Sequence, residues 1–339
     1  MTTNPRTPGN APSQDAAVKS SAAQRYALLE RARTSLRYAL QPIVNIHTGG
    51  IYGFEALLRG VEALGFPNVP SLFAAAWERG FAHALDLQLR ELAVAEFARI
   101  ENAARYRLFF NLDPRVMDLD SERPGQTLSI LERHGLPRET LCFELSEIAD
   151  LTTDPAVGDI LAGYRQHGFR LAIDDFGTGY AGLKLLYEHP PDLLKIDRFF
   201  ITGIASDHKK RLFVAATVQL AHVMGIPVVA EGVETESELL ACREIGCDML
   251  QGYLVARPQI RPQVPAGGYA HVGELNRRNR RAPRGDRALV ESHLQPITPI
   301  RESDSLKTMF EAFRRTRDHH ILPVIDAADR PVGFILEAD

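Results

Sequence analysis

The sequence has little cysteine and no long apolar run. Its three cysteines (Cys142, Cys242 and Cys247) form neither a CxxC pair nor a disulfide framework, which fits a reducing compartment. No apolar run reaches the roughly 18 residues that a membrane-spanning helix needs. The N-terminus lacks the charged and then apolar order of a signal peptide. We therefore expect a cytoplasmic protein with no membrane partner.

A strong excess of charge is also absent. Lysine and arginine number 39 against 43 aspartates and glutamates, a net charge of −4. This balance argues against nonspecific binding to nucleic acid, so we predict no DNA or RNA partner. The histidines lie scattered over helical stretches without paired spacing, which argues against a histidine metal site.

The chain instead shows a regular alternation of apolar runs of strand length with longer amphipathic segments. The expected strands are 37–44, 51–58, 106–112, 140–145, 169–174, 193–196, 227–230 and 249–254. Expected helices between them include 84–100, 125–134, 156–167, 209–224 and 236–245. Alternation of this kind predicts a mostly parallel sheet covered by helices. Eight strands in about 220 residues match a (β/α)8 barrel, with a doubly wound open sheet as the alternative.

Nearly every predicted strand carries, or is closely followed by, a residue that can bind a metal or a phosphate. These residues are Gln41, Glu55, Arg59, Asn111, Glu144, Glu147, Asp174, Asp175, Lys195, Asp197, Glu231, Glu234 and Gln251. In a barrel, the carboxyl ends of the strands meet at one mouth. Carboxylates at so many apolar strand ends would be costly to bury unless divalent cations gathered them. The pattern therefore predicts a metal site at that mouth.

Asp174 and Asp175 form the centre of this set. They are adjacent, follow the apolar run 170–173 and precede the turn Gly177-Thr178-Gly179. Neighbouring carboxylates repel each other, and a hard divalent cation removes that repulsion. Solvation of both acids on an exposed turn is the alternative. The glycines give this turn the conformational freedom to move when a metal or a partner binds.

Several of the other residues also have a structural explanation. Asn111 could form a turn before Asp113-Pro114, and Glu147 and Glu234 could favour helix dipoles as first-turn carboxylates. Lys195 and Asp197 could form an ordinary salt bridge, and Arg59 could be a surface residue. The site assignment therefore depends on these residues being brought together.

Seven motifs in this order resemble those of EAL domains, the cyclic di-GMP phosphodiesterases. They are Phe54-Glu-Ala-Leu-Leu-Arg-Gly60, Phe110-Asn-Leu-Asp-Pro114, Phe143-Glu-Leu-Ser-Glu147, Asp174-Asp-Phe-Gly-Thr-Gly-Tyr180, Leu194-Lys-Ile-Asp197, Ala230-Glu-Gly-Val-Glu234 and Gln251-Gly-Tyr253. The resemblance covers roughly residues 26–262. The sequence departs from the family at Tyr180-Ala-Gly-Leu183, where the family often has serines.

The resemblance implies a modified TIM barrel with one early antiparallel strand. It also implies hydrolysis of cyclic di-GMP to linear 5′-pGpG at a two-metal site for Mg²⁺ or Mn²⁺, in a protein that forms a homodimer. Two alternatives stay open: a catalytically silent cyclic di-GMP receptor, and a hydrolase of another phosphate ester.

The same resemblance assigns a role to each site residue. The implied metal ligands are Glu55, Asn111, Glu144, Asp174, Asp175 and Glu231. The implied catalytic residues are Glu55, Lys195, Glu231, Glu234 and Gln251, with Lys195 acting either as a fixed cation or as a base. The implied substrate-binding residues are Gln41, Arg59 and Asp197. Glu234 is expected to hold the loop after Asp175.

The flanking segments have a different character. Residues 1–25 are expected to be a disordered leader, although the pattern from about Gln14 to Leu36 is helical. Residues 263–288 contain an arginine cluster and predict a basic linker, with a helix docked on an acidic face or a nucleic-acid patch as alternatives. Residues 289–339 resemble one CBS motif, a β-α-β-β unit that pairs with a second copy to bind adenine nucleotides. We expect such pairing to occur within a dimer, or the chain to be truncated.

Overall fold

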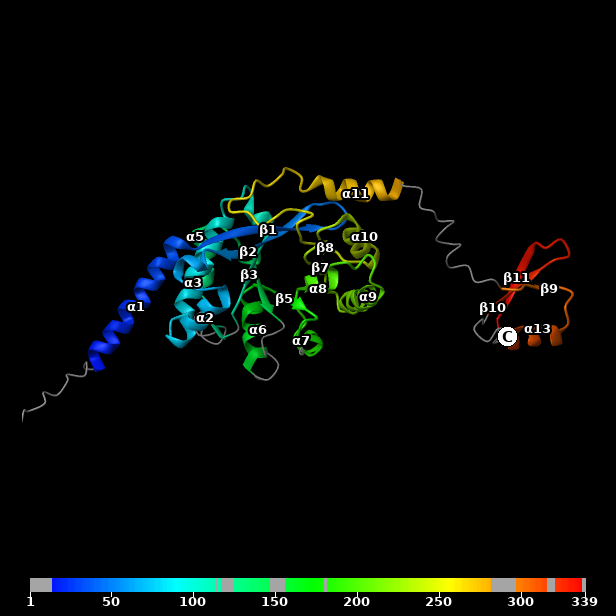
Figure 1. Cartoon of the computed structure of the whole chain (residues 1–339), viewed down its shortest axis with the longest axis horizontal. Helices are drawn as coiled ribbons and strands as arrows, with labels where there is room; N and C mark the ends of the chain where they lie inside the picture. Colours follow the sequence, from blue (N-terminus) through cyan, green and yellow to red (C-terminus); the bar gives the residue numbers. More distant parts are fainter. Residues whose placement is uncertain are drawn as a thin grey trace, which may run out of the picture. The chain divides into compact units, whose positions relative to one another are not determined.

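The chain forms two compact units, which divide between Arg278 and Asn279 (Figure 1). The structure is a computed structural model and describes residues 14–113, 115–116, 125–146, 156–179, 182–281, 297–315 and 321–336. Each unit has its own sheet and its own apolar core. The two units are therefore described separately.

The first unit is a closed barrel of eight strands in sequence order. The strands are β1 (Arg37–Asn45), β2 (Ile51–Arg59), β3 (Arg107–Asn111), β4 (Leu141–Ser146), β5 (Arg170–Phe176), β6 (Leu193–Ile196), β7 (Val228–Ala230) and β8 (Met249–Leu250). Strand β1 runs antiparallel to both of its neighbours, β2 and β8, and the other pairs are parallel. The predicted modified TIM barrel is confirmed, and the open sheet is wrong.

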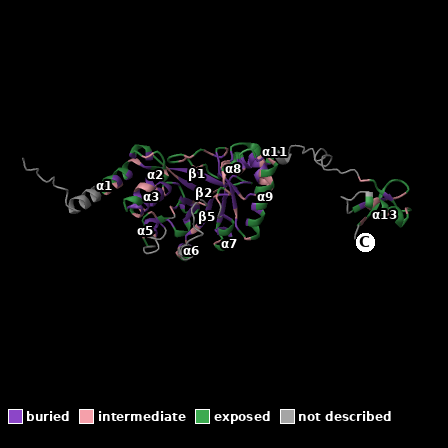
Figure 2. Ribbon diagram, turned by 60° about the horizontal axis from the view of Figure 1, so that its bottom comes forward, coloured by how far each residue is buried: buried purple, intermediate pink, exposed green. Residues whose placement is uncertain are grey.

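Helices surround the barrel, and the buried residues concentrate in the strands and on the inner sides of the helices (Figure 2). The longer helices are α1 (Gln14–Ser35), α2 (Val69–Glu78), α3 (Ala82–Phe97), α5 (Gly125–Arg133), α6 (Ala156–Gln166), α7 (Gly182–Glu188), α9 (His208–Val223), α10 (Glu236–Ile245) and α11 (Ala270–Arg281). The short α8 (Arg198–Ile201) and the 3-10 turns Val61–Leu64, Ala103–Arg105 and Arg138–Thr140 complete the unit. The five helices expected from the pattern are present. Helices α2 and α8 were not predicted.

An apolar layer fills one end of the barrel interior. It is a buried cluster with a side chain from each of seven strands, closed by a partly buried tyrosine from β2: Ile43, Tyr52, Phe109, Cys142, Ala172, Leu193, Val229 and Met249. Gly53 of β2 leaves room for its neighbours on β3, because a Cβ at Gly53 would lie 2.5 Å from the backbone oxygen of Arg107 and 2.9 Å from the ring of Phe109. This layer closes the barrel below the polar strand ends.

The ends of the first unit correct two expectations. The chain is helical from Gln14, so the expected leader through residue 25 is too long. The expected linker 263–288 is wrong over α11, because the Asn276 side chain of that helix is buried. Its amide donates to the backbone oxygens of Ile46 and His47 at 2.8 and 2.9 Å. A docked helix, one of the alternatives for this segment, is therefore present.

The second unit is a three-stranded sheet with one helix. Strand β10 (Ile321–Ile325) lies between β11 (Pro331–Leu336), which is antiparallel to it, and β9 (Ile300–Arg301), which is parallel to it. Helix α13 (Leu306–Arg315) supplies Met309 and Phe313 to the small core. The expected β-α-β-β order is present, whereas its relation to a CBS motif stays a prediction. No helix in the described part of the chain is long and apolar enough to cross a membrane.

Candidate functional site

Above the apolar layer, the barrel interior becomes polar. On seven strands the inward positions two residues further toward the mouth carry Gln41, Asn111, Glu144, Asp174, Lys195, Glu231 and Gln251. On β2 the same position is Glu55, two residues after Gly53. In a strand, residues two apart face the same side, so both layers point into the barrel. In the antiparallel β1 the direction reverses, and Gln41 precedes Ile43. The predicted convergence of polar residues at one mouth is present in the structure.

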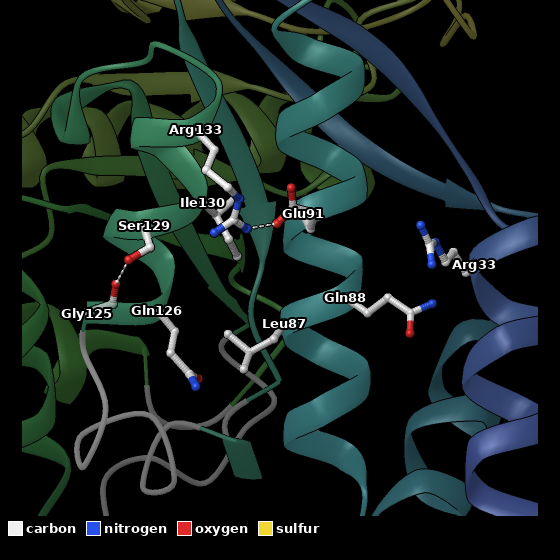
Figure 3. Close-up of a pocket in the computed structure, with 9 residues that line it drawn as sticks. All are labelled: Arg33, Leu87, Gln88, Glu91, Gly125, Gln126, Ser129, Ile130 and Arg133. Carbon is white, nitrogen blue, oxygen red and sulfur yellow. Dashed lines mark hydrogen bonds and ion pairs between the residues drawn. The ribbon is translucent and has the colours of Figure 1, made fainter.

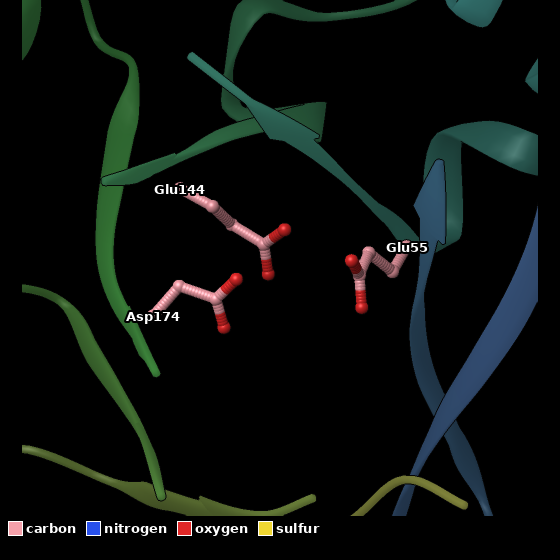
Figure 4. A group of neighbouring side chains, drawn as sticks. All are labelled: Glu55, Glu144 and Asp174. Atoms are coloured by element: carbon pink, nitrogen blue, oxygen red, sulfur yellow. The ribbon is translucent and has the colours of Figure 1, made fainter. Parts of the chain in front are cut away.

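Three carboxylates form the centre of this polar layer. Glu55 on β2, Glu144 on β4 and Asp174 on β5 are all buried and direct their oxygens toward a shared space (Figure 4). One oxygen from each lies within 4.8 Å of the others. A second such group consists of Asp174, Asp175 and Glu231. Since Asp174 belongs to both groups, the layer offers two adjoining clusters of oxygen ligands.

Lys195 lies among these acids, with its side chain fully buried. Its Nζ is 2.6 Å from oxygens of Glu144 and Glu231, 2.8 Å from Asp174 and 3.3 Å from Glu55. Burial alone would lower the pKa of Lys195, but the four carboxylates outweigh burial and raise that pKa well above its usual value. The lysine is therefore cationic in this arrangement.

The buried acids carry an unfavourable excess of negative charge. Burial raises the pKa of Glu144 and of Glu231 well above the ordinary value for glutamate, although Lys195 lowers both. One lysine against four carboxylates leaves an excess of negative charge when all are ionised. Cations can relieve that excess.

Amide side chains fix the positions of the central carboxylates. Asn111 Nδ2 donates to Glu55 Oε1 at 3.2 Å and to Glu144 Oε2 at 3.1 Å. Gln251 Nε2 donates to Glu55 Oε2 at 2.7 Å and to Gln41 Oε1 at 3.1 Å. The Gln251 Oε1 atom is buried and has no hydrogen-bond partner among the described residues. It is an acceptor ready for a water molecule or another donor.

Asp175 lies at the edge of the cluster in a left-handed backbone conformation, with φ of 54°. Burial, with help from Asp174 and Asp197, raises its pKa to about 6. Asp197 caps the short helix α8, because its Oδ1 accepts the N–H of Phe199 at 2.9 Å. The expected turn after Asp175 is present at Gly177, whose φ is 100°. Tyr180 and Ala181 of the expected departure lie outside the described residues.

A cavity of about 420 Å³ opens over the polar layer. Its wall includes Glu234, a predicted site residue, and Arg198, which was not predicted. The Glu234 carboxylate pairs with Arg198 at 2.8 Å, and its expected role in holding the loop after Asp175 stays a prediction. Arg198 directly follows the predicted Asp197, which was the available signal for it.

Arg59 lies outside this cavity. It lines an adjoining cavity of about 410 Å³, to which Asn111 and Leu57 also contribute. Its guanidinium donates to the backbone oxygen of Leu58 at 2.9 Å. The second cavity thus opens beside the polar layer and keeps an exposed cation at its wall.

A third cavity, of about 790 Å³, lies between α1, α3 and α5 (Figure 3). Arg133 pairs with Glu91 across part of its wall, and Arg33 reaches it from α1. No residue of the predicted site lines it. Size alone therefore does not select the functional cavity.

The structure brings together all the predicted metal ligands, with Lys195, Gln251 and Gln41. Asp197 and Glu234 line the same cavity, whereas Arg59 lines its neighbour. Glu147 lies outside the described residues. The donor set consists of carboxylates and one amide, which suits Mg²⁺ or Mn²⁺ better than zinc.

Comparison with known proteins gives a consistent result. The family model for the EAL domain matches residues 22–258. The chain is 34% identical over 239 residues to PdeI of Escherichia coli K12, a probable cyclic di-GMP phosphodiesterase, and this match covers 69% of the chain and 30% of PdeI. The chain spans about a third of the length of the curated relatives it matches.

Solved structures resemble the barrel as well. The EAL enzyme Bd1971, with cAMP and cyclic di-GMP bound, is 28% identical with a TM-score of 0.61, and the match covers 72% of this chain and 67% of that one. The manganese and cyclic di-GMP complex of Klebsiella pneumoniae BlrP1 is 31% identical with a TM-score of 0.60, covering 67% of this chain and 57% of that one.

Proposed function

Because the chain belongs to the EAL-domain family, we propose that its barrel hydrolyses cyclic di-GMP. The observation that carries this proposal is the pair of carboxylate clusters that share Asp174 beside the buried Lys195. The relative PdeI is a probable cyclic di-GMP phosphodiesterase, and the structures of Bd1971 and BlrP1 contain the dinucleotide. These matches support the same substrate for this chain.

Two divalent cations fit this donor set. Glu55, Asn111, Glu144 and Asp174 would hold one, and Asp174, Asp175 and Glu231 would hold the other. When bound, such ions supply Lewis-acid stabilisation of the phosphate and a lowered pKa for water. We propose Mg²⁺ or Mn²⁺, since the oxygen-rich site suits both.

The protein groups around the clusters have distinct tasks. Lys195, whose Nζ lies within 3.3 Å of four carboxylates, supplies a cation that stabilises the negative charge developing on the phosphate. Glu231 accepts a proton from the attacking water. The free Oε1 of Gln251 orients that water, while Gln41 fixes the amide of Gln251.

The reaction opens the cyclic dinucleotide at one phosphodiester bond. The water oxygen forms a bond to phosphorus, and the bond between phosphorus and the ribose 3′ oxygen breaks. The leaving 3′ oxygen takes up a proton from solvent water, Glu231 returns the proton of the attacking water to solvent, and the product is linear 5′-pGpG. Arg59 and Asp197, which line two adjoining cavities, contact the substrate.

Three further proposals complete this account. A homodimer and an adenine nucleotide bound by a completed C-terminal unit rest on resemblance, and mass measurement in solution and thermal shifts with AMP or ATP test them. A cytoplasmic location is supported by the three buried cysteines, which are free rather than disulfide-bonded.

Chromatography of the products tests the proposed activity. Purified protein is incubated with cyclic di-GMP and Mn²⁺ or Mg²⁺ at neutral pH, beside Glu55→Ala. We expect metal-dependent formation of pGpG by the wild type and none by the variant. Binding of the dinucleotide without turnover would refute the enzyme and favour a receptor. Equal turnover of an unrelated phosphodiester would favour a broader hydrolase.

A further inference from the structure

The carboxylate of Glu238 joins two loops on the catalytic side of the barrel. Its Oε1 accepts the backbone N–H of Gly203, just after α8, at 2.8 Å. Its Oε2 accepts the N–H groups of Glu234 and Thr235, just before α10, each at 3.0 Å. One side chain in the first turn of α10 thus binds the segment that follows β6 to the segment that follows β7.

This contact is buried and charged. Glu238 is 5% exposed, and such a carboxylate is tolerated only when hydrogen bonds replace water. Burial would raise the pKa of Glu238, but the amides of Gly203, Glu234 and Thr235 outweigh it and lower that pKa. Hydrogen bonds to a charged acceptor are stronger than neutral ones. The link between the two loops is therefore firm.

The two loops carry neighbouring parts of the wall of the catalytic cavity. Arg198 begins α8, and Glu234 follows β7; both line the cavity of about 420 Å³ and pair with each other at 2.8 Å. Both side chains are exposed, at 57% and 39%, so their own pairing is weak. The buried Glu238 contacts fix the backbone on which this exposed pair stands.

The segment that carries Glu231, just after β7, has separate support. The N–H of Glu231 donates to the backbone oxygen of Ile196 at 3.1 Å, and the N–H of Val233 donates to that of Gln251 at 3.0 Å. These sheet contacts hold Glu231 without Glu238. Loss of Glu238 would therefore displace the rim of the cavity and leave the carboxylate clusters in place.

We propose that Glu238 is a positioning residue that sets the substrate-binding rim formed by Arg198 and Glu234. The inference rests on the proposed function, since the ligand at this rim is the anionic cyclic dinucleotide. Arg198 supplies a cation for a phosphate of that ligand, and Glu234 holds the guanidinium in place. Glu238 determines how far apart the two loops stand.

Steady-state kinetics of Glu238→Gln test the proposal. Glutamine keeps the size of the side chain but replaces one carboxylate oxygen with an NH₂ group. The backbone N–H groups bound to that oxygen then lose their acceptor. We expect the KM for cyclic di-GMP to rise about tenfold while kcat stays within about twofold. The matched control is Glu236→Gln, which removes an exposed charge from the same helical turn and leaves both constants unchanged.

Other outcomes would overturn the proposal. A lower Tm for Glu238→Gln with an unchanged KM would show that Glu238 has only a structural role. An equal KM change in Glu236→Gln would show that the charge of the helix, and not the hydrogen bonds of Glu238, determines the KM. If the wild type does not turn over cyclic di-GMP, the proposed function fails, and the Kd for the dinucleotide with Ca²⁺ present then decides the role of Glu238 in the same way.

Discussion

Two layers of the barrel interior lie on the same strands but differ in the chemistry of their side chains. The lower layer is apolar and close-packed, from Ile43 and Phe109 through Met249. The upper layer, two residues further toward the mouth, holds buried acids around Lys195. Burial of the lower layer stabilises the fold, whereas burial of the charges in the upper layer destabilises it. The comparison indicates that stability and chemistry are separated within single strands.

The strongest way to break this comparison is to remove an acid from the upper layer. Glu55→Gln should lower the proposed phosphodiesterase activity by about 10³-fold or more, because a proposed metal ligand is lost. Its Tm without metal should stay equal or rise, since one repelling charge disappears. Activity assays with thermal melts check both, and a large fall in Tm would mean that the upper layer also stabilises the fold.

The matching test removes an apolar side chain from the lower layer. Phe109→Ala removes a ring that is 1% exposed and leaves a cavity at the floor of the barrel. The free energy of unfolding should fall by about 3–5 kcal/mol, as measured by urea denaturation. The conservative Phe109→Leu serves as the control and should cost less. An unchanged stability would contradict the assignment of this layer.

Much of this layered arrangement could be predicted from sequence. Polar residues at the ends of apolar runs, such as Asn111 and Glu144, identified the mouth before its geometry was known. The fit of Phe109 over Gly53 could not be predicted, because it depends on the register between β2 and β3. The burial of Asn276 also could not, since it depends on a contact with the β1–β2 turn about 230 residues earlier.

The contact between Glu238 and Gly203 could not be predicted from the sequence for a related reason. Its partner Gly203 is 35 residues away in the chain and offers only a backbone N–H, which carries no sequence signal. The capping box of Glu238 with Thr235 was the visible part of the arrangement. Short-range helix capping can be predicted from the sequence, whereas a contact with a second loop becomes visible only in the folded structure.

Metal binding should have a smaller effect, and one that depends on the upper layer alone. Mn²⁺ at about 100 times its Kd should stabilise the wild-type barrel by about 2.7 kcal/mol, because the ion binds only the folded acids. Thermal melts with and without Mn²⁺ measure this gain. Phe109→Leu should keep the gain and Glu144→Gln should lose most of it. The same gain in both variants would place the ion elsewhere.

The smallest effect concerns pH. Because the pKa of Glu238 is lowered in the folded state, its contribution to stability is present above the unfolded value of about 4.3 and is lost as pH falls through the folded pKa. The destabilisation caused by Glu238→Gln should therefore shrink between pH 6 and pH 3, conditions we choose for urea titrations. Glu236→Gln should show no such trend, and a difference independent of pH would contradict the charged hydrogen bonds.

The central claim is that the upper layer is the metal centre of a cyclic di-GMP phosphodiesterase, and Asp174 tests it most directly because it belongs to both carboxylate clusters. The measurement is the rate of pGpG formation against Mn²⁺ concentration for the wild type and for Asp174→Asn. The account predicts a saturating rise for the wild type and no detectable product for the variant, with both proteins folded. Turnover that ignores Mn²⁺, or that survives in Asp174→Asn, would contradict it.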